Sequence, residues 1–545
     1  MAKKKSKSKN RSVKRKRSAA KANKKLITIV IAAAIIIGGV LGGLLYVNLR
    51  SAEKNAQNAD EFFAVGEYRK AFKTYGRAVS KEPANLVYIG KLEDTLHNII
   101  PVTSDEAAAF YDSYLTALVH KSRYAPSNID FHLEVVEELY KAAHLTSITF
   151  YWRRLQAAAE SGYENISPDN PRRHELLLYV GLSSLKLENA SMTDVYDDEG
   201  NIRFPGEDEI EQVLEMDPGN EVAWAALTHG RLAVFYNLDQ QGQTKQARKN
   251  RALFDETLQS AMEVAGDSFG VLIVFFKEAA LQNAIFAKRF AEGNPATQEE
   301  LDAFKEEVTI AQEKLIQAYN PSEHGMRIVE VISILSSIKD GAKSANRLLE
   351  KHLEQYPKDF GRHYYHAFLL KQLGKFEEAE ASALLVVEAP QLTVSLEALE
   401  MFQYRPQAAQ FLVELAVLQA LDSDDELERS AHLAKAETYR EILAELVSNN
   451  SANQLLVYAD GLIALAEKRY LVAARLLEEV VSKNPNATAQ QLRYAANALK
   501  ETGSVGLAIE RLGGALQKEP SRLMNYVLKA RLELSISDFA EARNT

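Results

Sequence analysis

Apolar side chains along this chain follow the spacing of helices. From about residue 50 onward they recur three and four positions apart in runs of about 12 to 22 residues, such as Ser104–His120, Asp130–His144 and Gln298–Tyr319. Short groups of Gly, Pro, Asn and Asp separate these runs. We find no series of strand-like alternating positions. The pattern predicts an all-α fold of stacked helical hairpins rather than one globular core.

A spaced motif recurs within the helical pattern. It starts with Gly or Lys, carries an alanine five positions later and ends at a proline. The four copies are Gly66-x-Tyr68-x2-Ala71-x3-Tyr75-x2-Ala78-x4-Pro83, Gly374-x-Phe376-x2-Ala379-x3-Ala383-x2-Val386-x3-Pro390, Lys468-x-Tyr470-x2-Ala473-x3-Leu477-x2-Val480-x4-Pro485 and Gly503-x-Val505-x2-Ala508-x3-Leu512-x2-Ala515-x4-Pro520. A further start at Asp538–Ala542 and a helix-end proline at Pro218 fit the same period.

Each position of the motif has a physical reason. Glycine suits a turn between two helices because it tolerates a positive φ. Alanine is small enough for the two helices to approach closely, and the side chain four residues later fills the gap to the next hairpin. The proline ends the second helix.

These motifs resemble the tetratricopeptide repeat, a helix–turn–helix unit of about 34 residues. The resemblance implies a right-handed α-solenoid over residues 50–545 whose concave groove binds peptides or partner proteins. Clear repeats are expected near residues 52–85, 205–235, 360–392, 454–487 and 489–522, with a partial one at 523–545. Residues 90–210 and 225–340 are helical but off the pattern, and we interpret them as degenerate repeats.

The first fifty residues predict a membrane anchor. Residues 1–25 hold thirteen Lys and Arg and no acid, and residues 26–49 carry no charge over a length that can span a bilayer. Basic residues stay on the cytoplasmic side, so we expect a disordered cytoplasmic tail, one transmembrane helix and an extracytoplasmic solenoid. The apolar run is longer than that of a signal peptide and lacks an Ala-x-Ala site. The pairs Gly38/Gly42 and Gly39/Gly43 would permit a homodimer through this helix.

Charge and cysteine content narrow the class of protein. The net charge is −9, and without the +13 of the tail the remainder stands at −22. A nucleic-acid interface would be basic, so we expect the solenoid to bind no nucleic acid, while the tail would meet anionic lipid headgroups. The chain has no cysteine, which excludes disulfides, thiolate metal sites and a cysteine nucleophile. This composition favours a protein of the bacterial inner membrane and periplasm.

Four sequence features could carry chemistry, and each has a simpler explanation. Gly266–Gly270 matches G-x-S-x-G, but it follows a helical run rather than a strand. His363 and His366 lack a third metal ligand, so we interpret them as packed or groove-lining residues. Asp194–Asn201 fails the ligand spacing of a calcium loop. Arg493 and Asn497 resemble the opening part of a carboxylate clamp, although Leu528 stands where the next asparagine would be. We therefore predict no enzyme, no cofactor and no metal site.

The expected function is a membrane-anchored scaffold or adaptor that binds partner proteins or peptides. Positions on first helices that the repeat register places toward the groove are Tyr364, Phe368, Lys371, Gln372, Tyr458, Arg493, Asn497 and Lys500. One alternative is the targeting or regulatory region of a larger enzyme or complex, which the unfinished last repeat would favour. Another is a cytoplasmic solenoid that contacts RNA or the ribosome through its basic tail.

Overall fold

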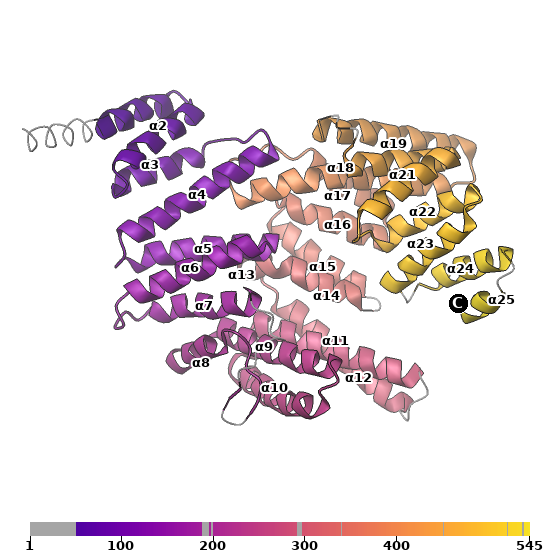
Figure 1. Cartoon of the computed structure of the whole chain (residues 1–545), viewed down its shortest axis with the longest axis horizontal. Helices are drawn as coiled ribbons and strands as arrows, with labels where there is room; N and C mark the ends of the chain where they lie inside the picture. Colours follow the sequence, from indigo (N-terminus) through magenta and orange to yellow (C-terminus); the bar gives the residue numbers. More distant parts are fainter. Residues whose placement is uncertain are drawn as a thin grey trace, which may run out of the picture. The chain divides into compact units, whose positions relative to one another are not determined.

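The described part of the chain is helical, which confirms the predicted all-α fold (Figure 1). The computed structural model describes residues 51–545 except 188–195, 198–199, 292–296, 339–340, 449, 451, 520–521 and 537–538. Within those residues one isolated bridge, between Tyr196 and Ile202, stands in place of any strand. The predicted tail at 1–25 and the predicted membrane helix at 26–49 lie outside the described residues.

The chain divides into two compact units. The first comprises residues 1–99 and 110–131, and the second comprises residues 100–109 and 132–545. In the first unit a helix over residues 51–64 precedes α2 (Tyr68–Lys81) and α3 (Leu86–Leu96). Its core includes Ala71 and Tyr75. Two helices, α4 (Ser104–Tyr124) and α5 (Ile129–Thr146), contribute residues to both units.

The second unit is a succession of helical hairpins. Its helices are α6 (Thr149–Asn165), α7 (Arg173–Leu187), α8 (Glu207–Met216), α9 (Glu221–Gln240), α10 (Thr244–Ala265), α11 (Phe269–Ala291), α12 (Gln298–Ala318), α13 (Pro321–His324), the 3₁₀ turn η1 (Gly325–Arg327), α14 (Ile328–Ser337), α15 (Gly341–Gln355), α16 (Phe360–Gln372), α17 (Phe376–Val387), α18 (Leu396–Asp422), α19 (Glu426–Leu446), α20 (Gln454–Ala466), α21 (Tyr470–Lys483), α22 (Ala489–Glu501), α23 (Val505–Lys518), α24 (Leu523–Ser535) and α25 (Phe539–Asn544).

Contacts in this unit are mostly between neighbours in sequence. The pairs include α6/α7, α7/α8, α9/α10, α11/α12, α14/α15, α16/α17, α18/α19, α20/α21, α22/α23 and α24/α25. First helices of successive hairpins also touch, since α9 packs on α11, α16 on α18 and α18 on α20. Nearest-neighbour stacking of this kind is what a solenoid requires.

One turn geometry closes the hairpins that the motif predicts. Gly66, Gly374 and Gly503 adopt φ of 77°, 75° and 80°, and Lys468 adopts 62° at the equivalent position. In each turn the next residue donates its backbone N–H to a carbonyl five residues back, at 2.8–2.9 Å. This is the Schellman arrangement that satisfies the last carbonyls of a helix.

The structure also contains a turn of this kind that the motif search missed. Gly242, between α9 and α10, has φ of 72°, and the Gln243 N–H donates to Leu238 O at 2.9 Å. Ala247 lies five positions after Gly242 and is buried, as in the other copies. The same Gly–Ala spacing therefore predicts this hairpin within residues 225–340, which otherwise depart from the repeat pattern.

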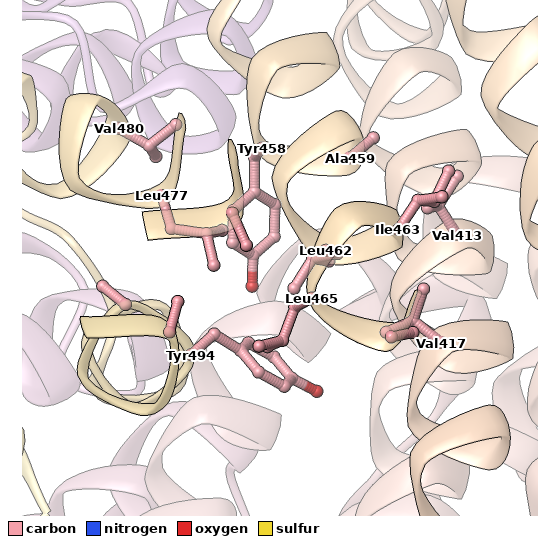
Figure 2. Packing of buried hydrophobic residues seen from close by; sticks show 14 of the residues in the cluster. Val413, Val417, Tyr458, Ala459, Leu462, Ile463, Leu465, Leu477, Val480 and Tyr494 are labelled. Atoms are coloured by element: carbon pink, nitrogen blue, oxygen red, sulfur yellow. The ribbon is translucent and has the colours of Figure 1, made fainter. Parts of the chain in front are cut away.

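The alanines of the motif lie where two helices come closest. Ala71, Ala379, Ala473 and Ala508 are all fully buried. In the apolar cluster that also contains Ala473, Tyr458 and Leu462 of α20 lie near Leu477 of α21 (Figure 2). Small residues at the crossing and large ones beside it therefore bury a continuous core from hairpin to hairpin.

Among the described residues, one helical segment is long and apolar enough to cross a membrane. It is Phe269–Ala287 of α11, of which 44% is buried. Phe269, Ile273 and Phe276 pack into the core formed with α12, α14 and α15. Helix packing within the unit thus explains the apolar character of this face of α11.

Replacing Lys468 with glycine should stabilise the protein by about 1 kcal/mol, because a side chain in the left-handed region is strained and glycine is not. The matched change is Gly503→Ala, whose added methyl group would meet no atom within 4 Å but would acquire the same strain. It should destabilise by about 1 kcal/mol. Urea denaturation of the full chain measures both, and equal or lower stability of Lys468→Gly would contradict this account of the turn.

Candidate functional site

Three of the predicted groove residues converge on one pocket near the end of the chain. Arg493, Asn497 and Lys500 line a pocket of about 340 Å³ between α22, α23 and α24. They share a face of α22 because they are spaced three and four apart. Arg522, at the N-cap of α24, and Arg531 add two more basic groups from the next hairpin.

The charges of this C-terminal pocket are only partly balanced. Arg493 pairs with Glu519, and an Arg522 nitrogen lies 3.8 Å from the same carboxylate. Lys500 lies 3.0 Å from Glu501. Among the described residues no acceptor is found for Arg531, which is exposed. The pocket therefore presents surplus positive charge.

The floor of the C-terminal pocket is apolar. Leu512, Leu528 and Leu532 line it together with Tyr494, which is buried. Within the described residues the Tyr494 hydroxyl has no hydrogen-bond partner. Leu528 is the residue that departs from the carboxylate-clamp pattern, and here it supplies apolar contact instead of an amide. A basic rim over an apolar floor suits an acidic segment that also carries apolar side chains.

The predicted residues of α16 have different surroundings. Tyr364 stacks on Tyr404 of α18, with ring centres 5.3 Å apart and planes 14° from parallel. Phe368 is about half exposed and Gln372 is exposed. Only Phe368 and Gln372 thus offer a free surface on this helix, while Tyr364 joins α16 to α18.

Lys371 and Tyr458 meet at a buried carboxylate. Lys371 forms an ion pair with Glu414 of α18, and the Tyr458 hydroxyl donates to the other Glu414 oxygen at 3.3 Å. Tyr458 is 2% exposed, so it offers no surface to a partner in this structure. These two residues connect α16 and α20 through α18, a role that helical register alone does not reveal.

The other sequence candidates have structural roles. The segment Gly266–Gly270 joins α10 to α11, as predicted: its last two residues already belong to α11, and a helix rather than a strand precedes it. A Cβ at Gly270 would come within 2.9 Å of Ala225 Cβ and 3.0 Å of Arg327 Nη1, so close packing explains this glycine. His363 and His366 each lie within hydrogen-bond distance of the Ser382 hydroxyl, at 3.3 and 3.2 Å.

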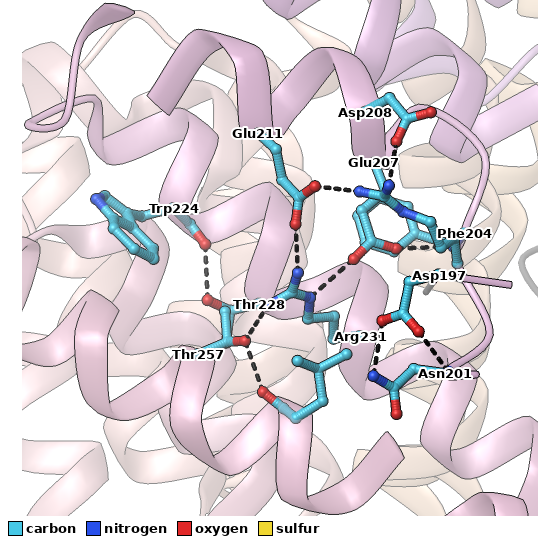
Figure 3. A network of polar contacts seen from close by, with 12 residues as sticks. Asp197, Asn201, Phe204, Glu207, Asp208, Glu211, Trp224, Thr228, Arg231 and Thr257 are labelled. Atoms are coloured by element: carbon cyan, nitrogen blue, oxygen red, sulfur yellow. Dashed lines mark hydrogen bonds and ion pairs between the residues drawn. The ribbon is translucent and has the colours of Figure 1, made fainter. Parts of the chain in front are cut away.

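The acidic loop is described only in part, because residues 194–195 and 198–199 lie outside the described residues. Asp197 accepts hydrogen bonds from the backbone and side chain of Asn201, at 2.6 and 2.7 Å. Nearby, Arg231 of α9 is held between Glu207 and Glu211 of α8 (Figure 3). The first contact closes the loop on itself, and the second joins α9 to α8.

A second cavity lies elsewhere in the second unit and was not predicted. This central cavity has a volume of about 650 Å³. Its lining comes from α5, the start of α6, η1 and the first helices of successive hairpins, namely α7, α9, α11, α14, α16 and α18. Such a volume is typical of pockets that hold small molecules.

Three cations and two carboxylates line the central cavity. Glu330 accepts from Lys277 at 2.7 Å and from Arg327 at 3.1 and 3.2 Å. Although burial opposes its charged form, these two cations hold the pKa of Glu330 well below its usual value. The second carboxylate, Glu400, is paired with the buried Arg362 at 3.4 Å. Within the described part of the chain no carboxylate forms an ion pair with Lys186.

Two histidines of the cavity are held neutral. Desolvation lowers the pKa of His144 to about 4 and that of His229 to about 3. The positive charges of Lys186, Lys277 and Arg327 act in the same direction, and Glu330 opposes them. His229 Nδ1 is buried without a hydrogen-bond partner among the described residues.

A sequence signal for this cavity existed. Lys186 and Lys277 each interrupt a strongly apolar helix, as the runs LLLYVGLSSLKL and FGVLIVFFKEAAL show. Lys186 is exposed in the last turn of α7 and Lys277 is half-buried, so each marks a break in an otherwise apolar run. That the two cations come together could not be inferred, because their spacing along the chain does not fit the repeat period.

No family model matches the chain, and no curated protein matches its sequence. Solved structures with similarity include TTC0263, a thermophilic TPR protein of Thermus thermophilus, at 18% identity over 38% of this chain and 98% of that one, with a TM-score of 0.30. Yeast Tom70 gives 13% identity over 91% and 96%, with a TM-score of 0.28. A tetratricopeptide repeat protein of Parabacteroides merdae ATCC 43184 gives 13% over 60% and 91%, with a TM-score of 0.29.

The neutral histidines predict acid sensitivity. Because the pKa of His229 is lower in the folded than in the unfolded chain, its contribution to stability is present above pH 6.5 and is lost as the pH falls toward 3. Between pH 7 and pH 5 this loss is about 2 kcal/mol. His229→Gln should remove that part of the decline in urea-denaturation profiles.

The control for this experiment is His97→Gln, because His97 is exposed on the surface of the first unit. The control should decline with pH as the parent protein does. If His229→Gln loses as much stability with falling pH as the parent protein does, His229 is protonated in the folded chain.

Proposed function

We propose that this chain is a non-enzymatic scaffold that holds an acidic segment of a partner protein in the C-terminal pocket between α22 and α24. The observation that supports it is the combination of surplus positive charge and an apolar floor in one pocket. None of the described residues lining the pocket is acidic. Charge complementarity therefore favours glutamate or aspartate side chains, or a terminal carboxylate, as the bound groups.

The surroundings of the pocket fit a segment longer than a single residue. Leu523 and Met524, at the start of α24, are 74% and 57% exposed. Exposed apolar side chains beside a basic pocket suit a peptide in which acidic and apolar residues are interspersed. Each hairpin supplies one side of the pocket, so the rigidity of the α22/α23 pair would pre-organise it.

The proposal extends to the place of the protein in the cell. The basic residues 1–25 and the uncharged residues 26–49 support a single membrane-spanning anchor with a cytoplasmic N-terminus. The scaffold would then hold its partner at the extracytoplasmic face of that membrane.

Charge reversal at the rim should weaken binding of an acidic peptide. The probe is a fluorescein-labelled octapeptide of alternating Glu and Leu, measured by fluorescence anisotropy with the full chain. Lys500→Glu combined with Arg531→Glu should raise the Kd about tenfold or more, because two attractions become repulsions. Both side chains are exposed, so the fold should be retained.

The binding measurement has two controls, one variant and one peptide. Lys73→Glu makes a charge reversal at an exposed position of α2 and should leave the Kd unchanged. An octapeptide of alternating Lys and Leu should not bind the parent protein. Equal affinity for the two peptides, or no effect of the double reversal, would contradict the proposed pocket.

Protease accessibility tests the topology. In spheroplasts of a bacterial host that produces the chain, external protease should cleave the region after residue 49 and leave the basic tail protected. An antibody tag placed before residue 1 reports the tail, and a cytoplasmic marker protein reports intactness. Cleavage of the helical region only after lysis would refute the extracytoplasmic placement.

A further inference from the structure

The central cavity is built from several separate segments of the chain. Lys186 comes from α7, Lys277 from α11 and Arg327 from η1, so cations from three elements reach one space of about 650 Å³. The three side chains line the same cavity. Fifty or more residues separate each from the next along the chain.

Charge in the central cavity is unbalanced. Lys277 and Arg327 share the single carboxylate of Glu330, which leaves one positive charge in excess, and Lys186 adds a second. Glu400 pairs with Arg362, which Asp359 also approaches at 3.9 Å, so across the whole lining three cations stand against two carboxylates. The excess opposes folding, since like charges brought into one cavity repel one another. It is also reflected in the lowered pKa of Lys186.

The packing around Arg327 keeps its guanidinium group beside this space. Nη1 of Arg327 lies where a Cβ at position 270 would approach within 3.0 Å, and only a glycine leaves the room. Nε and Nη2 are fixed by Glu330. The cation is thus oriented from two sides before any ligand is present.

The remaining wall is aromatic and aliphatic. Tyr140, Trp152 and Leu182 line one part of it. Tyr404 lies in another part, where its hydroxyl is 3.0 Å from that of Tyr365. An occupant that matches this lining has anionic oxygens at one end and an apolar body at the other.

We propose that the central cavity binds a small organic anion, whose carboxylate or phosphate oxygens contact Lys186, Lys277 and Arg327. The neutral His229, with its unpartnered Nδ1, offers a further hydrogen bond to such a ligand. The apolar body of the anion packs against the aromatic wall. This site is separate from the C-terminal pocket and does not depend on the scaffold function proposed for it.

Isothermal titration calorimetry of the full chain tests the site with four probes. These are 1-naphthyl phosphate, 1-naphthoate, inorganic phosphate and neutral 1-naphthol. At least one of the two naphthyl anions should bind saturably, and the stronger of the two identifies phosphate or carboxylate as the preferred head group. Inorganic phosphate should bind about tenfold or more weakly because it lacks the apolar body, and 1-naphthol should not bind measurably.

The decisive variant is Lys186→Met. It removes an unpaired charge while keeping the length of the side chain, so the thermal midpoint of the protein should stay level or rise. Affinity for the naphthyl anion should fall about tenfold or more, because a charge-assisted hydrogen bond is lost. Loss of affinity without loss of thermal stability would show that Lys186 acts in binding, because a merely structural residue would lower both when replaced. Lys245→Met, at an exposed position of α10, is the matched control and should change neither quantity.

A second variant closes the space instead of removing charge. Ser333 of α14 lines the cavity and is exposed there, so Ser333→Phe should fill it and abolish binding. No saturable binding of either naphthyl anion at millimolar concentration would overturn the proposal. So would unchanged affinity in Lys186→Met, or binding of 1-naphthol as tight as that of the anions.

Discussion

The close approach of paired helices at alanine is the constraint on which the second unit depends. Where Ala379, Ala473 and Ala508 lie fully buried, the two helices of a hairpin leave no room for a larger side chain. Larger residues beside each crossing then reach the next hairpin, so that one apolar cluster continues from α16 to α24. Stacking of this kind places first helices next to first helices. Their shared face is where both pockets occur.

Stacking also explains why polar groups distant in sequence meet. A charged residue on the shared face of a first helix can therefore find its partner on a first helix beside it. Glu414 satisfies Lys371 and Tyr458 in this way, from the hairpins before and after its own. The same arrangement brings Glu330 to Lys277. Pairs of this kind connect neighbouring hairpins. Replacing only one partner lowers the stability of the fold, because the other charge is then left without a counter-ion.

Features that depend on local spacing, such as the turns, could be predicted from the sequence. The surroundings of a side chain could not be predicted where contacts between hairpins determine them. The four turns follow from the Gly–Ala motif, and even Lys468, which replaces the glycine, adopts the left-handed conformation. Tyr458 could not be placed correctly, because register assigns a residue to a helix face without saying whether another hairpin covers that face. Arg493 and Asn497 were correctly grouped since they share one helix. Lys186 was overlooked because its significance lies in helices distant along the chain.

The two pockets differ in a way that bears on what each can do. In the C-terminal pocket the basic groups are mostly exposed, so water and salt screen them and they attract a partner without a large cost when it is absent. In the central cavity Lys186 is itself exposed, but it lines the same space as Lys277 and Arg327, which share one carboxylate, so like charges repel one another there. An exposed basic pocket suits reversible contact with a flexible segment. An excess of positive charge that several helices bring to one cavity gains most from a bound anion, because the anion offsets the repulsion between the cations.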